Sequence, residues 1–166
     1  MKISIVQTNS GPIVAENLEN ILKAMTTAVE TEAPDLIALP EYALCLTGDR
    51  QVAERNAQVL DGSEPVSALA SFAASHRTAV HLGSVVERSP DGRYYNTSVV
   101  FGPSGARLAQ YRKRNLFATE RPEWRGSVVH NEATFLSEGE TPTTFELRGI
   151  TFGNSICYDL RFPEFY

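Results

Sequence analysis

The feature that most constrains the fold is a regular alternation of strand and helix patterns along the first half of the chain. Residues 2–7 alternate like a strand, and residues 16–32 carry apolar side chains at helical spacing. The continuous apolar run at 36–39 has the pattern of a strand buried on both faces, which is typical of parallel sheets. A second helix is expected over 64–76 and a further strand over 78–87. This order predicts an α/β layered domain whose first strands are joined by helical crossovers.

Strand patterns continue in the second half, where turns and loops rather than helices separate them. Residues 94–102 and 107–112 predict two strands joined by a hairpin-like connection. The stretch 113–139 is irregular and charged, and it is expected to be a long loop of the kind that often carries function. Two further strands are expected after this loop, over 143–147 and 151–156.

The composition limits the class of protein. With 166 residues and neither a linker nor a repeat, the chain suits a single domain over residues 1–166. Hydrophobic residues make up 42% and charged residues 21%, which indicates a soluble globular protein rather than a disordered one. The net charge of −5 argues against a nucleic-acid partner. No apolar run approaches the roughly 20 residues that span a bilayer, and the N-terminus lacks the apolar stretch of a signal peptide. We therefore expect a cytoplasmic protein with no membrane partner.

Two cysteines, Cys45 and Cys157, lie far apart in unlike contexts, and they suggest neither a disulfide framework nor a metal site. An apolar run leads up to Cys157, and polar residues follow Cys157 directly. A nucleophile can be carried in this way on a strand-to-helix turn, although a cysteine in an apolar strand is often only a small buried side chain. A nucleophilic cysteine also needs a base or a positive charge nearby, because an unperturbed thiol with a pKa of about 8.5 is mostly protonated near neutrality.

Histidine is the usual partner of a nucleophilic cysteine, but no histidine here has a convincing setting. His76 closes a predicted helix, where a cation suits the helix dipole. His81 lies inside a predicted strand, and His130 lies in the long loop. A Cys–His hydrolase that uses His81 or His130 stays open as an alternative.

Two better partners stand at the ends of other predicted strands. Glu41 lies just beyond the buried strand 36–39, at the edge where α/β sheets build their sites. Desolvation there would raise the pKa of its carboxyl towards the range of a general base, whereas the plainer interpretation is a solvated loop glutamate. Lys113 begins the long loop, and strand alternation points it away from Arg112 and Arg114, which are expected to be solvated. An inward ammonium could stabilise a thiolate and then an oxyanion.

Together, three motifs in this order resemble the Glu-Lys-Cys signature of the nitrilase, or carbon–nitrogen hydrolase, superfamily. The motifs are Leu39-Pro40-Glu41-Tyr42, Tyr111-Arg112-Lys113-Arg114-Asn115-Leu116-Phe117 and Ile156-Cys157-Tyr158-Asp159-Leu160-Arg161-Phe162-Pro163-Glu164. The segment 96–101 also resembles the family's residues before the lysine, so that the resemblance covers essentially the whole chain. It implies the N-terminal part of an αββα sandwich. Because the family's chains are longer, it also implies a domain that is incomplete at its C-terminus.

The resemblance implies a role for each motif. Glu41 would be the general base, Lys113 would stabilise the tetrahedral intermediate, and Cys157 would form a thioester acyl-enzyme. The backbone N–H of Tyr158 would be a second oxyanion donor. Glu132 matches a further glutamate that the family often shows, although Glu138 and Glu140 are nearby. No metal or organic cofactor is implied.

Two departures accompany the resemblance. The family commonly has histidine two positions after the lysine, where this chain has Asn115, so substrate orientation or loop packing is expected to differ. The chain also ends soon after the nucleophile, at Tyr166. Arg161 and Glu164 are expected to be structural, as an ion pair that holds the turn after the nucleophile.

The expected activity is hydrolysis of a small linear amide with release of ammonia. Within the superfamily, the stretch from residue 82 to 113 most resembles the branch of omega-amidases and deaminated-glutathione-type amidases. Nitrile or N-carbamoyl hydrolysis is the alternative within the superfamily, and a catalytically incompetent fragment is the alternative from another class. The resemblance favours a homodimer or larger assembly of the full-length form, and a small-molecule amide as the substrate.

Overall fold

The computed structural model describes residues 1–119 and 130–166, with the side chain of His130 left out. The strands are β1 (Ile3–Ile5), β2 (Leu36–Ala38), β3 (Ala79–Arg88), β4 (Tyr94–Phe101), β5 (Arg107–Arg112), β6 (Ala118–Thr119), β7 (His130–Asn131), β8 (Thr144–Leu147) and β9 (Ile150–Gly153). The α-helices are α1 (Val14–Glu32), α2 (Arg50–Arg55) and α3 (Glu64–His76). Short 3₁₀ helices follow as η1 (Glu132–Thr134), η2 (Cys157–Arg161) and η3 (Pro163–Phe165).

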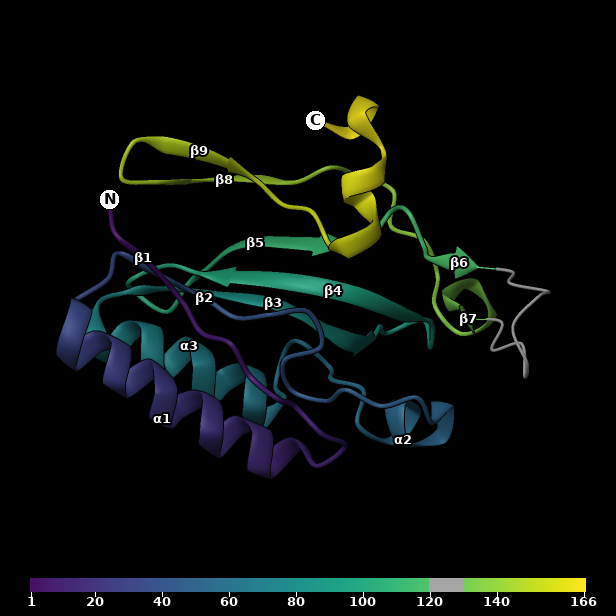
Figure 1. The fold of residues 1–166 in the computed structure, drawn as a ribbon, viewed down its shortest axis with the longest axis horizontal. Helices are drawn as coiled ribbons and strands as arrows, with labels where there is room; N and C mark the ends of the chain where they lie inside the picture. The colour runs from purple at the N-terminus through teal and green to yellow at the C-terminus, as the bar shows by residue number, and fades with distance from the viewer. Residues whose placement is uncertain (120–129) are drawn as a thin grey trace.

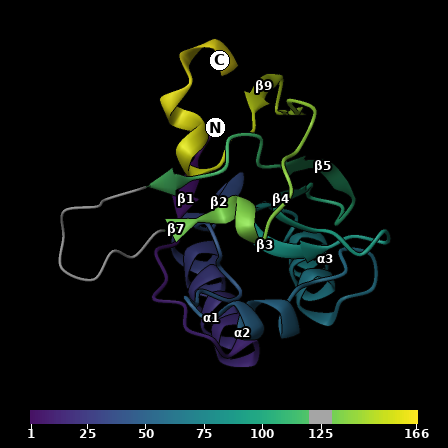
Figure 2. The same cartoon turned by 90° about the vertical axis from the view of Figure 1, so that its right-hand side faces the viewer.

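One five-stranded sheet, ordered β1-β2-β3-β4-β5, organises the molecule. The first three strands run parallel and the last two pair antiparallel, which confirms helical crossovers early in the chain and hairpins later. Helices α1 and α3 cover one face of this sheet, and the β8–β9 hairpin with the C-terminal turns lies over the other (Figure 1; Figure 2). The chain thus forms a layer of helices, a five-stranded sheet and a two-stranded hairpin that lies over the sheet's other face.

Side chains from both faces of the sheet are buried. On the helical face, Ile21 of α1 and Leu69 of α3 are fully buried against the strands. On the opposite face, Leu36 and Val100 pack against Phe145 of the hairpin. The double-sided burial explains why the run at 36–39 is apolar throughout, and it confirms that prediction.

The local signals at the ends of α3 explain why its predicted bounds are correct. The Ser63 side chain accepts a hydrogen bond from the backbone N–H of Val66, and proline stands in the first turn. The helix ends at His76, and the next residue, Arg77, caps it in the left-handed conformation at φ 51°. Helix α2 was not predicted, because six residues are too few to show an apolar period; Asp49 caps it by accepting from the backbone N–H groups of Gln51 and Val52.

The predicted loop over 113–139 is only partly irregular. It holds β6, β7 and η1, while residues 120–129, with Pro122 and Gly126, lie outside the described part. The last strand, expected over 151–156, ends at Gly153, and three residues without regular structure lead to η2. Cys157 is therefore the first residue of a 3₁₀ helix that follows a short connection rather than a strand directly.

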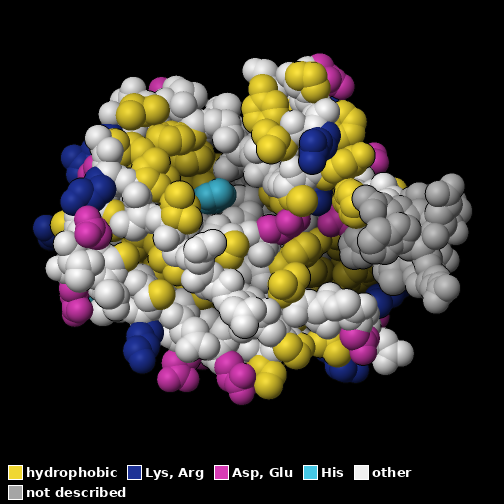
Figure 3. All heavy atoms as spheres, viewed as in Figure 1, with side chains coloured by type: hydrophobic (Ala, Val, Ile, Leu, Met, Phe, Trp, Pro, Cys, Tyr) yellow, Lys and Arg dark blue, Asp and Glu magenta, His cyan; other side chains and the backbone are white. Residues whose placement is uncertain are grey.

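Several large apolar side chains are exposed around the hairpin, the edge strand β1 and the C-terminal turns. Ile5 is 80% exposed and Leu160 is 74% exposed. On the side of the molecule seen in Figure 3, hydrophobic side chains gather over the hairpin and around the C-terminal turns. None of the helices in the described part of the chain combines the length and the apolar character that a membrane crossing needs.

Candidate active site

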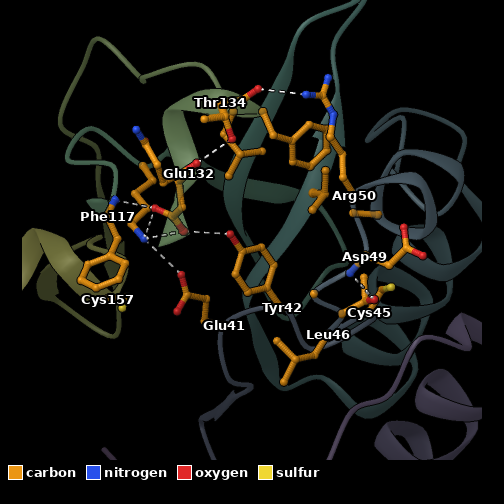
Figure 4. Close-up of a pocket in the computed structure, with 18 residues that line it drawn as sticks. Glu41, Tyr42, Cys45, Leu46, Asp49, Arg50, Phe117, Glu132, Thr134 and Cys157 are labelled. Atoms are coloured by element: carbon orange, nitrogen blue, oxygen red, sulfur yellow. Dashed lines mark hydrogen bonds and ion pairs between the residues drawn. The ribbon is translucent and has the colours of Figure 1, made fainter. Parts of the chain in front are cut away.

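The three motif residues Glu41, Lys113 and Cys157 meet at one end of the sheet. Glu41 follows β2, Lys113 follows β5, and Cys157 follows β9. All three line a cavity of about 520 Å³, and Glu132 lines it as well (Figure 4). Residues that lie far apart in the sequence therefore converge where the motifs predicted a site.

Lys113 is the centre of the charged cluster. Its side chain is fully buried, and Nζ donates to the two carboxylate oxygens of Glu132 at 2.8 and 3.1 Å and to Oε1 of Glu41 at 3.4 Å. Burial by itself would lower the pKa of Lys113, but the hydrogen bond to Glu132 and the charges of both glutamates outweigh it and raise the pKa. The structure therefore holds an ammonium ion inside the cavity at neutral pH.

Strand alternation orients Lys113 as predicted, but Arg112 is not the solvated residue that was expected. Its guanidinium forms an ion pair with the buried carboxylate of Glu87 at 2.5 Å and lies 3.9 Å from the centroid of the Tyr95 ring. Gly139 packs closely against the same stretch: a Cβ there would overlap the backbone of Arg112, and its own N–H donates to the backbone oxygen of Lys113 at 2.8 Å. Neighbouring side chains thus fix the backbone that carries Lys113.

Glu41 is held by its neighbours in the chain and across the sheet. Its Oε1 accepts from Nδ2 of Asn96 at 2.8 Å, and the next residue, Tyr42, has the left-handed φ of 52° and donates its backbone N–H to Oγ of Ser84 at 3.0 Å. The Glu41 side chain is 29% exposed, so it is less desolvated than its position after a buried strand suggested.

Of the three glutamates that could be the family's further glutamate, Glu132 lies in the cavity, whereas Glu138 and Glu140 line a separate surface hollow. It accepts from Oη of Tyr42 at 3.1 Å and from the backbone N–H of Phe117 at 2.7 Å, besides Lys113. Burial, with the charge of Glu132, raises the pKa of Tyr42, so the phenol stays a donor. Glu41, Tyr42 and Glu132 point toward one another (Figure 4).

Cys157 brings an exposed thiol to this cluster. The residue has a φ of 47°, a left-handed conformation that is uncommon for a side chain with a Cβ and that concentrates at functional sites. Burial raises the pKa of the thiol, the charge of Glu41 raises it further, and Lys113 acts in the opposite direction. The thiol is therefore mostly protonated at neutral pH and needs a base to become a nucleophile.

Asp159, which the sequence analysis did not single out, holds the turn after Cys157. It is fully buried, and one oxygen accepts from the backbone N–H of Ile156 at 2.9 Å and from Oη of Tyr111 at 2.6 Å. The other accepts from the backbone N–H and the side-chain amide of Asn115 at 2.9 and 2.8 Å. Asn115 thus stabilises the turn after Cys157 through Asp159. The sequence signal that could have identified Asp159 was its place as an acidic residue in the first turn of a helix.

The expected ion pair of Arg161 and Glu164 is wrong. Both side chains are exposed, and in the described part of the chain no ion pair joins them. Tyr158, whose backbone N–H is the predicted oxyanion donor, packs its ring edge-on against Phe117 at 5.1 Å and Phe162 at 5.5 Å between centroids. Asp159 and these aromatic contacts take the structural role that was expected of the ion pair.

The two histidines with described side chains lie outside the cavity. His81 shares a hydrogen bond of 2.9 Å with Oγ of Ser98, and burial lowers its pKa. His76 stacks against Phe72 at the end of α3. The side chain of His130 lies outside the described part. Within the described residues, no group of three His, Cys, Asp or Glu side chains could hold a metal ion.

The far end of the cavity is formed by residues that no motif indicated. Cys45, Leu46, Asp49 and Arg50 lie at the opposite end from Cys157 (Figure 4). The Arg50 guanidinium donates to the backbone oxygen of Thr134 at 3.0 Å and lies 5.3 Å from the centroid of the Phe135 ring. The cavity therefore extends well beyond the charged cluster.

Comparisons with known proteins agree with this arrangement. The Carbon-nitrogen hydrolase family model matches residues 2–166. The omega-amidase NIT2 of Homo sapiens is 31% identical over 163 residues, which are 98% of this chain and 56% of that protein. A deaminated glutathione amidase of Synechocystis is 30% identical over 166 residues, covering 97% of this chain and 58% of that one.

The fold agrees as well. The crystal structure of Saccharomyces cerevisiae Nit3, a member of branch 10 of the nitrilase superfamily, gives a TM-score of 0.84 at 26% identity, and the match covers 99% of this chain and 58% of that one. The chain spans about half the length of the curated relatives it matches. The predicted fold, the N-terminal part of the superfamily's α/β sandwich, is confirmed. The chain belongs to the carbon–nitrogen hydrolase family.

Proposed function

We propose that this site hydrolyses the carbon–nitrogen bond of a small linear amide through an acyl-enzyme on Cys157. The observation that carries the proposal is the buried ammonium of Lys113, held between Glu41 and Glu132 in the cavity that the Cys157 thiol also lines. A base, a cation and a protonated thiol are the groups that acyl transfer to sulfur requires.

In the first half of the reaction, a carboxylate oxygen of Glu41 takes the proton of the Cys157 thiol as the sulfur attacks the amide carbon. The carbonyl electrons move to oxygen, and the oxyanion is stabilised by Lys113 and by the backbone N–H of Tyr158. The intermediate collapses, the C–N bond breaks, and Glu41 returns the proton to the leaving nitrogen. Ammonia leaves, and a thioester remains on Cys157.

In the second half, water takes the place of ammonia. Glu41 removes a proton from the water as its oxygen attacks the thioester carbon, and the same donors stabilise the second oxyanion. The C–S bond then breaks, the sulfur recovers its proton from Glu41, and the carboxylic acid is released. The base therefore acts twice and ends each cycle ionised.

Glu132 supports the cation in this proposal rather than the bond-making atoms. Its carboxylate neutralises a charge that would otherwise be costly to bury, and its bonds to Tyr42 and Phe117 fix its direction. Relatives named omega-amidase and deaminated glutathione amidase support an amide as the substrate over a nitrile or an N-carbamoyl compound.

Ammonia release from a panel of ω-amides, N-carbamoyl amino acids and nitriles tests the reaction class. We expect release from the amides, and its loss in Cys157→Ser, Glu41→Gln and Lys113→Ala. His81→Ala is the matched control and should retain activity. Release from nitriles alone would refute the choice of substrate, and loss in His81→Ala with retention in Glu41→Gln would favour the Cys–His alternative.

The alternative of a non-catalytic polypeptide needs its own measurement, because the chain spans about half the length of its relatives. Circular dichroism with a thermal melt reports whether the 166 residues fold cooperatively, and sedimentation reports whether they associate. The exposed Ile5 and Leu160 support association with further protein. A cooperative, monomeric chain with turnover that depends on Cys157 would exclude the non-catalytic alternative.

A further inference from the structure

Asn96 connects two of the three proposed catalytic residues. It lies in β4, between β3 and β5, and its side chain is fully buried. Its Nδ2 donates to Oε1 of Glu41 at 2.8 Å, and its backbone oxygen accepts from the N–H of Lys113 at 2.9 Å. A single residue of a central strand therefore contacts both the candidate base and the residue that carries the cation.

The other atom of the Asn96 amide is unusual. Its Oδ1 is buried and has no hydrogen-bond partner among the described residues, whereas the neighbouring buried side chains Thr97 and Ser98 bond to Glu87 and His81. A buried acceptor without a hydrogen-bond partner destabilises the folded state. The amide cannot relieve this by turning over, because Oδ1 would then face the carboxylate of Glu41. Stability alone does not explain an amide at this position.

The contacts also distinguish the two oxygens of Glu41. Among the described residues, two nitrogen donors reach this carboxylate, Nδ2 of Asn96 and Nζ of Lys113, and both contact Oε1. With two donors already directed at it, Oε1 is the less available of the two oxygens for a third proton. Oε2 is then the oxygen available to the thiol of Cys157, which lines the same cavity.

We propose that Asn96 is a positioning residue that fixes Oε1 of Glu41 and presents Oε2 to the Cys157 thiol. The inference rests on the proposed function, in which Glu41 takes the thiol proton. The groups that face Glu41 are the ammonium of Lys113, the thiol of Cys157, the phenol of Tyr42 and the Asn96 amide, with Glu132 behind Lys113. Asn96 is the member of this set that does not titrate, so an ionisable group placed there adds a charge beside Glu41.

Two substitutions separate positioning from support of the fold. Asn96→Leu removes the orphaned acceptor with little change in volume, so we expect the urea midpoint of unfolding to stay near that of the wild type. The rate of Cys157 alkylation by iodoacetamide at pH 7.5 should fall roughly tenfold, because the base is no longer held. Peptide mass spectrometry of the full chain reads this rate, with Cys45 as the internal reference.

Asn96→Asp supplies a pH signature that a structural role would not produce. A protonated Asp can donate to Oε1 as the amide does, whereas an ionised Asp repels Glu41. We therefore expect the ratio of variant to wild-type alkylation at Cys157 to lie near one at pH 5.5 and to fall more than tenfold by pH 8.5. Ser98→Ala, on the same strand, is the matched control and should alkylate like the wild type.

The outcomes are distinguishable. Wild-type alkylation of Cys157 in both Asn96 variants would overturn the inference, as would a loss that appears equally at Cys45 or only together with a lowered urea midpoint. Glu41→Gln tests the proposed function separately. If Glu41→Gln alkylates Cys157 at the wild-type rate, the proposed base is wrong; if Glu41→Gln slows it and the Asn96 variants do not, only the inference about Asn96 fails.

Discussion

Gly83 permits the backbone approach that places Glu41, and Gly83→Ala is the sharpest test of that dependence. A Cβ at Gly83 would overlap the backbone oxygen of Leu39 and lie 2.5 Å from the carbonyl carbon and oxygen of Pro40. Ordinary contact begins at 3.4 Å, so the segment before Glu41 would have to move by about 1 Å. The obstacle is backbone rather than the end of a flexible side chain, so a local rotamer change cannot relieve it.

The cost follows from the bonds that hold this segment to β3. Leu39 donates its N–H to the oxygen of His81 at 2.9 Å, and Ser84 donates to the oxygen of Pro40 at 3.3 Å. Overpacking costs about 1–3 kcal/mol, and a weakened backbone hydrogen bond adds about 0.5–1.5 kcal/mol. We therefore expect the free energy of unfolding to fall by about 2–4 kcal/mol, which corresponds to about 4–16 °C in the melting temperature of a chain of this size.

The functional effect should exceed the effect on stability. A catalytic group displaced by 1 Å can lose about a hundredfold in rate, and Glu41 lies directly after the displaced Pro40. Thermal melts and iodoacetamide alkylation of Cys157 measure the two effects. Gly11→Ala is the matched control, because a Cβ at Gly11 meets no heavy atom within 4 Å. A Gly83→Ala variant with the wild-type melting temperature and alkylation rate would refute the reasoning.

Three further changes test the charged and buried groups. Glu132→Ala leaves the buried Lys113 ammonium with only its longer contact to Glu41, so the free energy of unfolding in urea should fall by about 3–5 kcal/mol. Glu132→Gln is the neutral, isosteric control, and a smaller loss in Glu132→Ala than in Glu132→Gln would contradict this account. Burial lowers the pKa of His81, so below pH 6.5 the unfolded chain binds a proton that the folded chain does not, and stability should fall with acidification. His81→Gln should lose that component of the pH dependence, and an unchanged slope would exclude His81 as its source. Asp159→Ala leaves buried donors unpaired and should cost about 3 kcal/mol or more by urea unfolding, compared with about 1 kcal/mol for Tyr111→Phe; equal losses would show that Asp159 does not join the segments.

The parts of the fold that were predictable are those whose signals are local. The bounds of α3 and β5 agree with the predicted ranges, because a serine cap, a proline and a clear alternation mark them. Helix α2 escaped prediction because its six residues bury no apolar face. The early end of β9 was missed for a related reason, since Asn154 and Ile156 are buried as a strand would require but lie in the turn that leads to Cys157.

The sequence indicated which motif residues line the cavity, but not which contacts they make there. Motif order indicated Glu41, Lys113 and Cys157, while the spacing of residues along the chain carries no information about distances across a sheet. Arg112 and Glu87 form their ion pair across 25 positions of the sequence, so periodicity alone suggested a solvated arginine. Asn96 illustrates the same limit, because nothing in the sequence shows that its amide reaches Glu41, which follows β2 on the other side of β3.

The strands that carry the proposed catalytic groups differ in how firmly they are held in the fold, and Asp159 compensates for the weakest of these attachments. Glu41 and Lys113 leave strands of a five-stranded sheet that is covered on both faces. Cys157 follows the two-stranded β8–β9 hairpin, and such a hairpin by itself is only marginally stable. Asp159 bypasses the hairpin, because its carboxylate joins the turn at Ile156 directly to the loop that begins at Lys113. The separation of the Cys157 thiol and the Lys113 ammonium therefore depends on this buried carboxylate as well as on the packing of the hairpin against the sheet.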